Sequence, residues 1–151
     1  MRVREVMTPG VVTLEETATC HDAVARMVRH RVRHLPVVGQ DGAPRGIVTD
    51  RDLRHQLFAP DTFRQIGTVS VERLMSEVPV SRVMSSPVVS VDAEAELGEA
   101  ARIMEEEKLG SLPVVEQGRL VGIVTETDLL RQIVGEDACC ADVETIVVSF
   151  P

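Results

Sequence analysis

The strongest constraint on the fold is an internal repeat. When the chain is shifted by 77 residues against itself, residues 6–38 align with residues 83–115 and 11 of these 33 positions are identical. After a one-residue gap, residues 46–53 align with residues 122–129, with six of eight positions identical. A unit of roughly fifty residues is small for an independent hydrophobic core. The sequence therefore predicts two related units that form one pseudo-symmetric module.

The hydrophobic pattern has the same order in both units and predicts an α/β (α+β) fold, each unit reading β-α-β-β-α. In the first unit we expect strands and helices, in chain order, over residues 11–14, about 19–30, 35–38, 46–49 and 50–57. In the second unit the corresponding ranges are residues 88–91, about 94–107, 112–115, 120–125 and a helix from residue 126. Asp41-Gly42 and Gln117-Gly118 supply the turns between the two later strands.

These patterns divide the chain into four segments. The predicted boundaries are residues 1–58 for the first repeat, 59–81 for a connector, 82–135 for the second repeat and 136–151 for a C-terminal tail. The connector contains a candidate short helix over residues 70–75. The tail is β-prone and has no counterpart in the repeat.

The charge of the chain is unevenly divided between its two parts. The net charge is −8, but residues 1–58 hold nine arginines, seven acidic residues and all four histidines, which gives +2. Residues 59–151 hold seven cations and seventeen acidic residues, which gives −10. Overall acidity argues against a nucleic-acid binder, and the lack of Trp and Tyr removes the usual stacking platforms. The basic first repeat can still bind a phosphorylated small molecule.

Composition also predicts the cellular setting. The mean hydropathy is +0.06, and no apolar run is long enough for a membrane span. No signal peptide is visible at the N-terminus, and the three cysteines lack ligand-like spacing. We therefore expect a cytoplasmic protein that contacts no membrane.

Three motifs occur in both units: Met-Thr or Met-Ser before a Val-Val pair, Leu-Pro-Val-Val, and Gly-Ile-Val-Thr-x-x-Asp-Leu. Together they resemble a tandem CBS-domain pair, or Bateman module, over about residues 3–134. The segment Gly-Ile-Val-Thr-Asp-Arg-Asp-Leu-Arg and the connector are further similar to the acetoin-utilisation CBS proteins. The resemblance implies two repeats packed about a pseudo-twofold axis, and a flat homodimer of two chains.

The Thr-x-x-Asp segments, Thr49 to Asp52 and Thr125 to Asp128, lie where a strand passes into a helix. One interpretation is a capping box, in which the threonine and the acid satisfy each other's backbone N–H groups. The resemblance adds a second role, because in CBS proteins this segment binds the ribose of adenosine ligands. The two roles are compatible.

Basic residues lie at the start of the first buried strand and at the start of the helix over residues 50–57. Arg33 and His34 lie where CBS proteins that bind phosphorylated ligands place basic residues, and Arg51 can add a third donor from the neighbouring turn. Basic residues at a helix C-terminus also suit the helix dipole. The matching positions of the second repeat are Gly110, Ser111 and Thr127. That segment supplies hydroxyls and no cation, so we expect phosphate recognition chiefly from the first repeat.

The resemblance also implies an adenine-binding strip that begins at Thr8 and Ser85, although ordinary strand packing explains most of its valines. The complete predicted ligand-binding set is Thr8, Val12, Arg33, His34, Thr49, Arg51, Asp52, Ser85, Val89, Gly110, Ser111, Thr125, Thr127 and Asp128.

Other chemistry has little support in the sequence. His30 and His34 have i,i+4 spacing without a matched carboxylate motif, and Cys20 and His21 are neighbours whose side chains diverge on a helix. No P-loop, GxGxxG or GxSxG motif occurs, so we expect no enzyme, no metal and no required cofactor. The predicted function is regulatory sensing of AMP, ADP or ATP in the cleft between the repeats of a homodimer that acts on an unknown regulated protein. The alternative is a structural dimerisation or protein-interaction module that binds no nucleotide.

Overall fold

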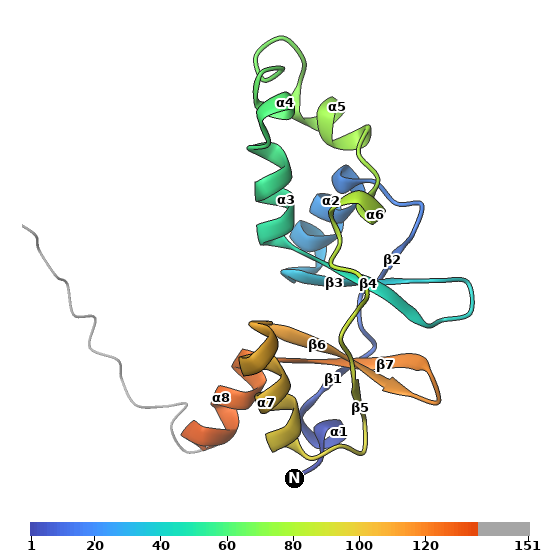
Figure 1. The fold of residues 1–151 in the computed structure, drawn as a ribbon, viewed down its shortest axis with the longest axis vertical. Coiled ribbons are helices and arrows are strands. Elements are labelled where there is room, and N and C mark those ends of the chain that lie inside the picture. Colours follow the sequence, from blue (N-terminus) through green and yellow to red (C-terminus); the bar gives the residue numbers. More distant parts are fainter. Residues whose placement is uncertain (136–151) are drawn as a thin grey trace, which may run out of the picture.

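The computed structural model describes residues 1–135, which form two α+β units stacked along the long axis of the molecule (Figure 1). The predicted tail, residues 136–151, lies outside the described residues. No helix within residues 1–135 has the length and apolar character needed to cross a bilayer. The two-repeat architecture predicted from the sequence is confirmed.

The first unit has a three-stranded sheet in the order β2-β3-β4, covered by two helices. Its elements are β2 (Leu14–Glu15), α2 (Cys20–His30), β3 (His34–Val38), β4 (Pro44–Thr49) and α3 (Asp50–Leu57). Strand β2 is parallel to β3, and β4 is antiparallel to it, with Leu35 opposite Val48. Both of these side chains are fully buried in the core of this unit.

The second unit repeats this arrangement. Its elements are β5 (Val91–Asp92), α7 (Leu97–Glu107), β6 (Ser111–Glu116), β7 (Arg119–Thr125) and α8 (Glu126–Val134). Leu112 lies opposite Val124, at the repeat positions of Leu35 and Val48. The sequence pattern started the first helix of this unit near residue 94, whereas α7 starts three residues later. The N–H of Glu94 bonds to the Asp92 carboxylate, which forms a turn before the helix.

Three short helices connect the two units in the chain and lie on the first unit (Figure 1): α4 (Pro60–Phe63), α5 (Val71–Ser76) and α6 (Val80–Val83). The predicted connector helix corresponds to α5, which is capped by the Ser70 side chain and packs against α2. Helices α4 and α6 are single turns, too short for a periodic pattern to predict.

The leading segments of the two repeats are exchanged. Helix α1 (Val3–Val6) and strand β1 (Thr8–Pro9) pack on the second unit, where Val3 is fully buried and Thr8 lies opposite Ile123. In the same way, α6 of the second repeat packs into the first unit, where Val80 is fully buried. Each core is thus completed by the other repeat, which explains how two small units form one module.

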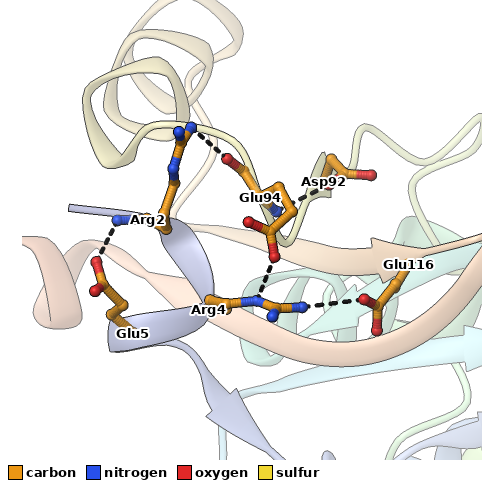
Figure 2. A network of polar contacts seen from close by, with 6 residues as sticks. All are labelled: Arg2, Arg4, Glu5, Asp92, Glu94 and Glu116. Atoms are coloured by element: carbon orange, nitrogen blue, oxygen red, sulfur yellow. Dashed lines mark hydrogen bonds and ion pairs between the residues drawn. The ribbon is translucent and has the colours of Figure 1, made fainter.

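Arginine side chains connect α1 to the second unit (Figure 2). Arg4 Nε lies 2.7 Å from Glu94 Oε1, and Arg4 Nη2 lies 3.0 Å from Glu116 Oε1. Arg2 Nη1 donates to the backbone carbonyl of Glu94 at 2.7 Å. These side chains are exposed, so each ion pair contributes little to stability. The burial of Val3 holds the helix, and the arginines orient it.

A glycine allows each exchanged segment to approach the sheet. A Cβ atom on Gly46 would lie 2.6 Å from Met84 Sδ and 2.9 Å from the carbonyl oxygen of Ser85. A Cβ on Gly122, the matching glycine, would lie 2.5 Å from Met7 Sδ. The glycine in each Gly-Ile-Val-Thr motif is therefore required by the close passage of the other repeat.

Candidate functional site

A cavity of about 480 Å³ lies between the two units, at the N-terminal ends of α3 and α8. It is lined by Arg31, Arg33, His34, Ile47, Thr49, Asp50, Arg51, Asp52, Arg54, Ser85, Lys108, Leu109, Gly110, Ser111, Thr125, Glu126 and Thr127. The lining comes from both repeats, because the strand-to-helix junctions of the two units face each other. Its size is that of a typical small-molecule site.

Both Thr-x-x-Asp segments form the predicted capping boxes. At the first junction, Thr49 donates to Asp52 Oδ2 from its backbone N at 2.8 Å and from its hydroxyl at 2.9 Å. At the second, Thr125 donates to Asp128 Oδ2 at 2.9 Å and 2.7 Å. Each arrangement holds the aspartate rigidly in the first turn of its helix.

The two aspartates differ in how available they are to a ligand. Asp52 is half-buried and lines the cavity, and no donor within residues 1–135 bonds to its Oδ1 atom. Asp128 is 8% exposed and lies outside the cavity lining, and its Oδ1 is 3.6 Å from Arg131 Nη1. Of these two aspartates, Asp52 is therefore the one that presents a free carboxylate oxygen to a ligand in the cavity.

Cations from both repeats face the cavity. Arg31 and Lys108 occupy matching repeat positions and end α2 and α7 in the left-handed conformation, with φ of 54° and 57°. Lys108, two residues before Gly110, adds a cation from the second repeat that the sequence prediction did not include. Arg54 pairs with Asp50 at 3.3 Å, so it is partly neutralised. The remaining guanidinium and ammonium groups make the cavity attractive to an anion.

His34 of the first repeat lines the cavity and approaches the second repeat at Gly110. A Cβ atom added to Gly110 would lie 3.5 Å from His34 Nε2 and 3.8 Å from Glu126 Oε2, so these two side chains meet at Gly110. Burial lowers the pKa of His34, and the charge of Arg33 lowers it further, against the opposing effect of nearby carboxylates. The imidazole is therefore neutral near pH 7 and can both donate and accept a hydrogen bond.

Ser111 carries the most specific indication of a ligand. Its side chain is 4% exposed, lines the cavity, and its Oγ has no hydrogen-bond partner within the described part of the chain. Leaving a buried hydroxyl unsatisfied costs roughly 1–3 kcal/mol. A polar ligand atom in the cavity would remove this cost.

Ten of the fourteen predicted residues line the cavity. Thr8, Val12, Val89 and Asp128 lie outside the lining. The exchange of leading segments explains part of this division, because it brings Ser85 to β4 of the first unit and Thr8 to β7 of the second.

The cavity also contains residues that were not predicted: Arg31, Ile47, Asp50, Arg54, Lys108, Leu109 and Glu126. A signal for two of them is present in the sequence, since Arg31 and Lys108 are basic at the same repeat position. The others could not be separated from ordinary flanking residues.

Within residues 1–135, metal and thiol chemistry would each depend on a particular arrangement of side chains. Among residues 1–135, no group of three or more His, Cys, Asp or Glu side chains is arranged to hold a metal ion. Cys20 is buried in the first core, and burial raises its pKa to about 11. Its thiol is therefore protonated and a poor nucleophile at neutral pH.

The sequence profile of the CBS domain matches residues 3–59 and 80–135. The chain belongs to the CBS domain family and contains a tandem pair of these domains, which are generally regulatory and non-catalytic modules. The family resemblance inferred from the repeated motifs is confirmed.

Several relatives share both the sequence and the fold. The CBS domain-containing protein YhcV of Bacillus subtilis is 34% identical over 137 residues, covering 90% of this chain and 89% of the relative. The crystal structure of an acetoin-utilisation protein (AcuB) from Vibrio cholerae is 34% identical, with a TM-score of 0.70 over 89% of this chain and 90% of that one. The structure of CBSX2 in complex with AMP is 26% identical, with a TM-score of 0.71 over 88% and 96%. The chain spans only 32% of an uncharacterized Methanocaldococcus jannaschii relative that is 34% identical to it.

Proposed function

We propose that this protein is a regulatory sensor that binds an adenosine nucleotide in the cavity between its two CBS repeats. The observation that carries the proposal is the meeting, in one cavity of about 480 Å³, of a free Asp52 oxygen, an unpartnered Ser111 hydroxyl and several cations. The AMP complex of the related CBSX2 supports the same class of ligand.

Each part of a nucleotide has a suitable partner in the cavity. The Asp52 Oδ1 atom can accept both ribose hydroxyls, because its other oxygen is held by Thr49. Arg33, Arg51 and Lys108 can bind phosphate oxygens through charge-assisted hydrogen bonds. The aliphatic side chains of Ile47 and Leu109 provide apolar surface for the base.

The proposal keeps a role for the predicted residues outside the lining. Asp128 serves as a weaker second ribose acceptor, because its Oδ1 must first leave Arg131. Thr8, Val12 and Val89 stay as predicted contacts of the adenine base.

A ligand in this cavity contacts both repeats at once. Thr49 and Asp52 come from the first unit, whereas Lys108 and Ser111 come from the second. Binding therefore stabilises one relative arrangement of the two units over others, and this is how a ligand can change what the module presents to a regulated protein. The proposal includes no catalytic step and no required cofactor. It includes a cytoplasmic location, which the cysteine pattern favours.

Thermal unfolding with a panel of AMP, ADP, ATP, adenosine, S-adenosylmethionine and NAD tests the proposal. A ligand that binds only the folded protein raises the unfolding temperature as its concentration increases. At a hundred times its Kd, it adds about 2.7 kcal/mol to the free energy of unfolding. We expect at least one adenine nucleotide to do so in wild type, and to do so less in Asp52→Ala. No shift with any adenosine compound would leave the alternative, a module that binds no nucleotide.

A homodimer is the second part of the proposal, and exposed apolar side chains favour it. Val28 on α2 is 74% exposed and Ile133 on α8 is 81% exposed. Apolar surface of this kind, gathered on the helical side of the module, is typical of an interface. Light scattering at micromolar concentration tests this part independently of nucleotide binding.

A further inference from the structure

We propose that Glu126 sets the charge limit of the ligand, so that the cavity binds an adenosine monophosphate in preference to nucleotides that carry further phosphates. This inference rests on the proposed nucleotide binding and adds the residue that distinguishes among the nucleotides. The two repeats differ at one pair of equivalent positions, and this difference supplies the physical basis.

Asp50 and Glu126 are equivalent acidic residues of the two repeats. Each is the first residue of a helix, Asp50 in α3 and Glu126 in α8, and both line the cavity. Asp50 Oδ2 lies 3.3 Å from Nη2 of Arg54 on the same helix, so its charge is partly neutralised. The Glu126 carboxylate forms no ion pair and accepts no hydrogen bond within the residues that the structure describes. Glu126 therefore presents an uncompensated negative charge to the cavity.

The missing partner of Glu126 follows from a single difference between the repeats. Asp50 and Arg54 are four residues apart, and residues at this spacing are neighbours on a helix surface. The repeat counterpart of Arg54 is Leu130, which is 59% exposed and carries no charge. The second repeat thus keeps the acid and lacks the arginine that neutralises it in the first.

Glu126 lies close to the first repeat. A Cβ atom on Gly110 would lie 3.8 Å from Glu126 Oε2 and 3.5 Å from His34 Nε2. Burial has the largest effect on the pKa of His34 and lowers it, whereas the negative charge of Glu126 acts in the opposite direction. The Glu126 charge therefore acts across the cleft, on groups that belong to the first repeat or are bound by it.

The two walls of the cavity differ in charge. Arg33 and Arg51 on the first-repeat wall form no ion pair within residues 1–135. Lys108 on the second-repeat wall lies 3.9 Å from Glu105, and Glu126 adds a negative charge to the same wall. The first-repeat wall thus offers the charge-assisted hydrogen bonds that hold the phosphate of a monophosphate.

Further phosphates gain less in this cavity. A phosphate chain that extends across the cleft approaches the Glu126 carboxylate, and like charges at short range repel each other. A chain that extends out of the cleft leaves the arginines and returns to water. Glu126 is exposed in the free protein, so water and salt weaken the repulsion. We therefore expect a preference for the monophosphate and not an absolute exclusion of longer phosphate chains.

Isothermal titration calorimetry of adenosine, AMP, ADP and ATP against wild type and Glu126→Gln tests the inference. The buffer contains no divalent cation, so the charge of each ligand is set by its phosphates. We expect Glu126→Gln to improve the affinity for ATP on the order of fivefold, to improve that for ADP by less, and to leave that for adenosine unchanged. The ratio of the ATP and AMP dissociation constants within one variant removes any general effect of the substitution on the fold.

Glu107→Gln is the matched control. Glu107 is an exposed acid at the end of α7 in the same unit, and it lies outside the cavity lining. The substitution removes the same charge from the protein, so we expect the wild-type ratio of ATP and AMP dissociation constants. An equal change in both variants would show that the net charge of the unit decides the ratio, and would overturn the role of Glu126.

Leu130→Arg restores in the second repeat the pair that Asp50 and Arg54 form in the first. The new guanidinium follows Glu126 by four residues at an exposed position, so it should neutralise the carboxylate without disturbing the core. We expect the ratio of the ATP and AMP dissociation constants to fall as it does in Glu126→Gln. Leu130→Gln, which adds no charge, should keep the wild-type ratio.

The outcomes separate this inference from the proposed function. Nucleotide binding with the same ratio in wild type and Glu126→Gln would overturn the charge limit and leave the nucleotide site in place. Tighter binding of ATP than of AMP by wild type would also overturn it, because further phosphates would then gain affinity. If no adenosine compound bound to wild type, the proposed function would be wrong together with this inference.

Discussion

Ser85 and Ile47 form a reciprocal backbone pair: the Ser85 N–H donates to the Ile47 carbonyl at 3.0 Å, and the Ile47 N–H donates to the Ser85 carbonyl at 3.3 Å. The two residues belong to different repeats. Their pairing brings Ser85 into the cavity that contains Thr49 and Asp52. In the second unit, Thr8 lies opposite Ile123 in the equivalent exchange. The candidate site therefore depends on the crossing of the two repeats.

Gly46→Ala should destabilise the fold and weaken ligand binding. The new Cβ would lie 2.9 Å from the Ser85 carbonyl oxygen, and a backbone atom cannot move away as easily as the Met84 side chain. We expect a loss of about 1–3 kcal/mol in the free energy of unfolding, typical of overpacking, measured by urea titration. The affinity of the folded variant for its ligand should fall as well, because Ser85 is displaced.

Gly98→Ala is the control for this substitution. Gly98 lies in α7, and a Cβ there has no neighbour within 4 Å. We expect stabilisation of roughly 0.5–1 kcal/mol from helix propensity alone, with unchanged ligand affinity. Equal stability changes for the two variants would contradict the close passage at Gly46.

Asp52→Ala should weaken binding of an adenosine ligand by about 1–3 kcal/mol, since the ribose would lose a charged acceptor. Asp128→Ala should have a smaller effect on affinity, because Asp128 is nearly buried and lies near Arg131. Isothermal titration calorimetry of AMP against both variants measures the difference.

The first helix supplies a matched control for the loss of a cap. Asp22 forms the same capping box with Thr19 at the start of α2, outside the cavity. Asp22→Ala should lower stability by about 1 kcal/mol and leave affinity unchanged. If Asp52→Ala behaved in the same way, Asp52 would be a cap and nothing more.

Arg33→Ala should reduce the affinity for AMP more than the affinity for adenosine, because adenosine lacks the phosphate. Arg33 is exposed, so the difference should shrink as salt concentration rises. Lys108→Ala should show a similar preference, since its ammonium group faces the same cavity. Arg29→Ala, an exposed position outside the lining, is the control. Equal losses for AMP and adenosine would assign Arg33 to the fold or to the base.

The stability of the protein should fall as pH decreases through about 6.5, the ordinary pKa of histidine. Burial lowers the pKa of His34, so the unfolded chain takes up this proton at a higher pH than the folded protein does. The unfolded state is then favoured, and the loss is complete below the lowered pKa of the folded state.

His34→Gln should remove this part of the pH dependence, whereas His55→Gln, at an exposed position, should retain it. Urea unfolding between pH 5 and pH 8 measures the effect. An identical pH profile for wild type and His34→Gln would show that His34 does not carry it.

Local patterns predicted much of the secondary structure. The helix over residues 50–57 and the strands that contain Leu35 and Leu112 were expected from periodicity alone, and both Thr-x-x-Asp caps were confirmed. These features depend on neighbours within a few residues in the chain, where side-chain spacing and capping decide the conformation. The repeat itself showed that the two units must share one module.

The exchange of leading segments could not be derived in this way. No local pattern shows whether Val3 packs on its own repeat or on the other repeat, because both cores offer similar apolar surfaces. The sequence also could not show that Asp52 lines the cavity whereas Asp128 does not, since the two Thr-x-x-Asp motifs are nearly identical.

The sequence by itself therefore determined the two repeats, the order of their elements, the chemistry of the cavity residues and the uneven charge. Only the tertiary structure decided which repeat completes each core, which aspartate has a free oxygen, and which cations meet across the cleft. These outcomes depend on contacts between residues that lie far apart in the sequence, such as Arg4 and Glu116, which are 112 positions apart. Such contacts form only when two copies of one motif, alike in their local preferences, pack against each other in a single arrangement.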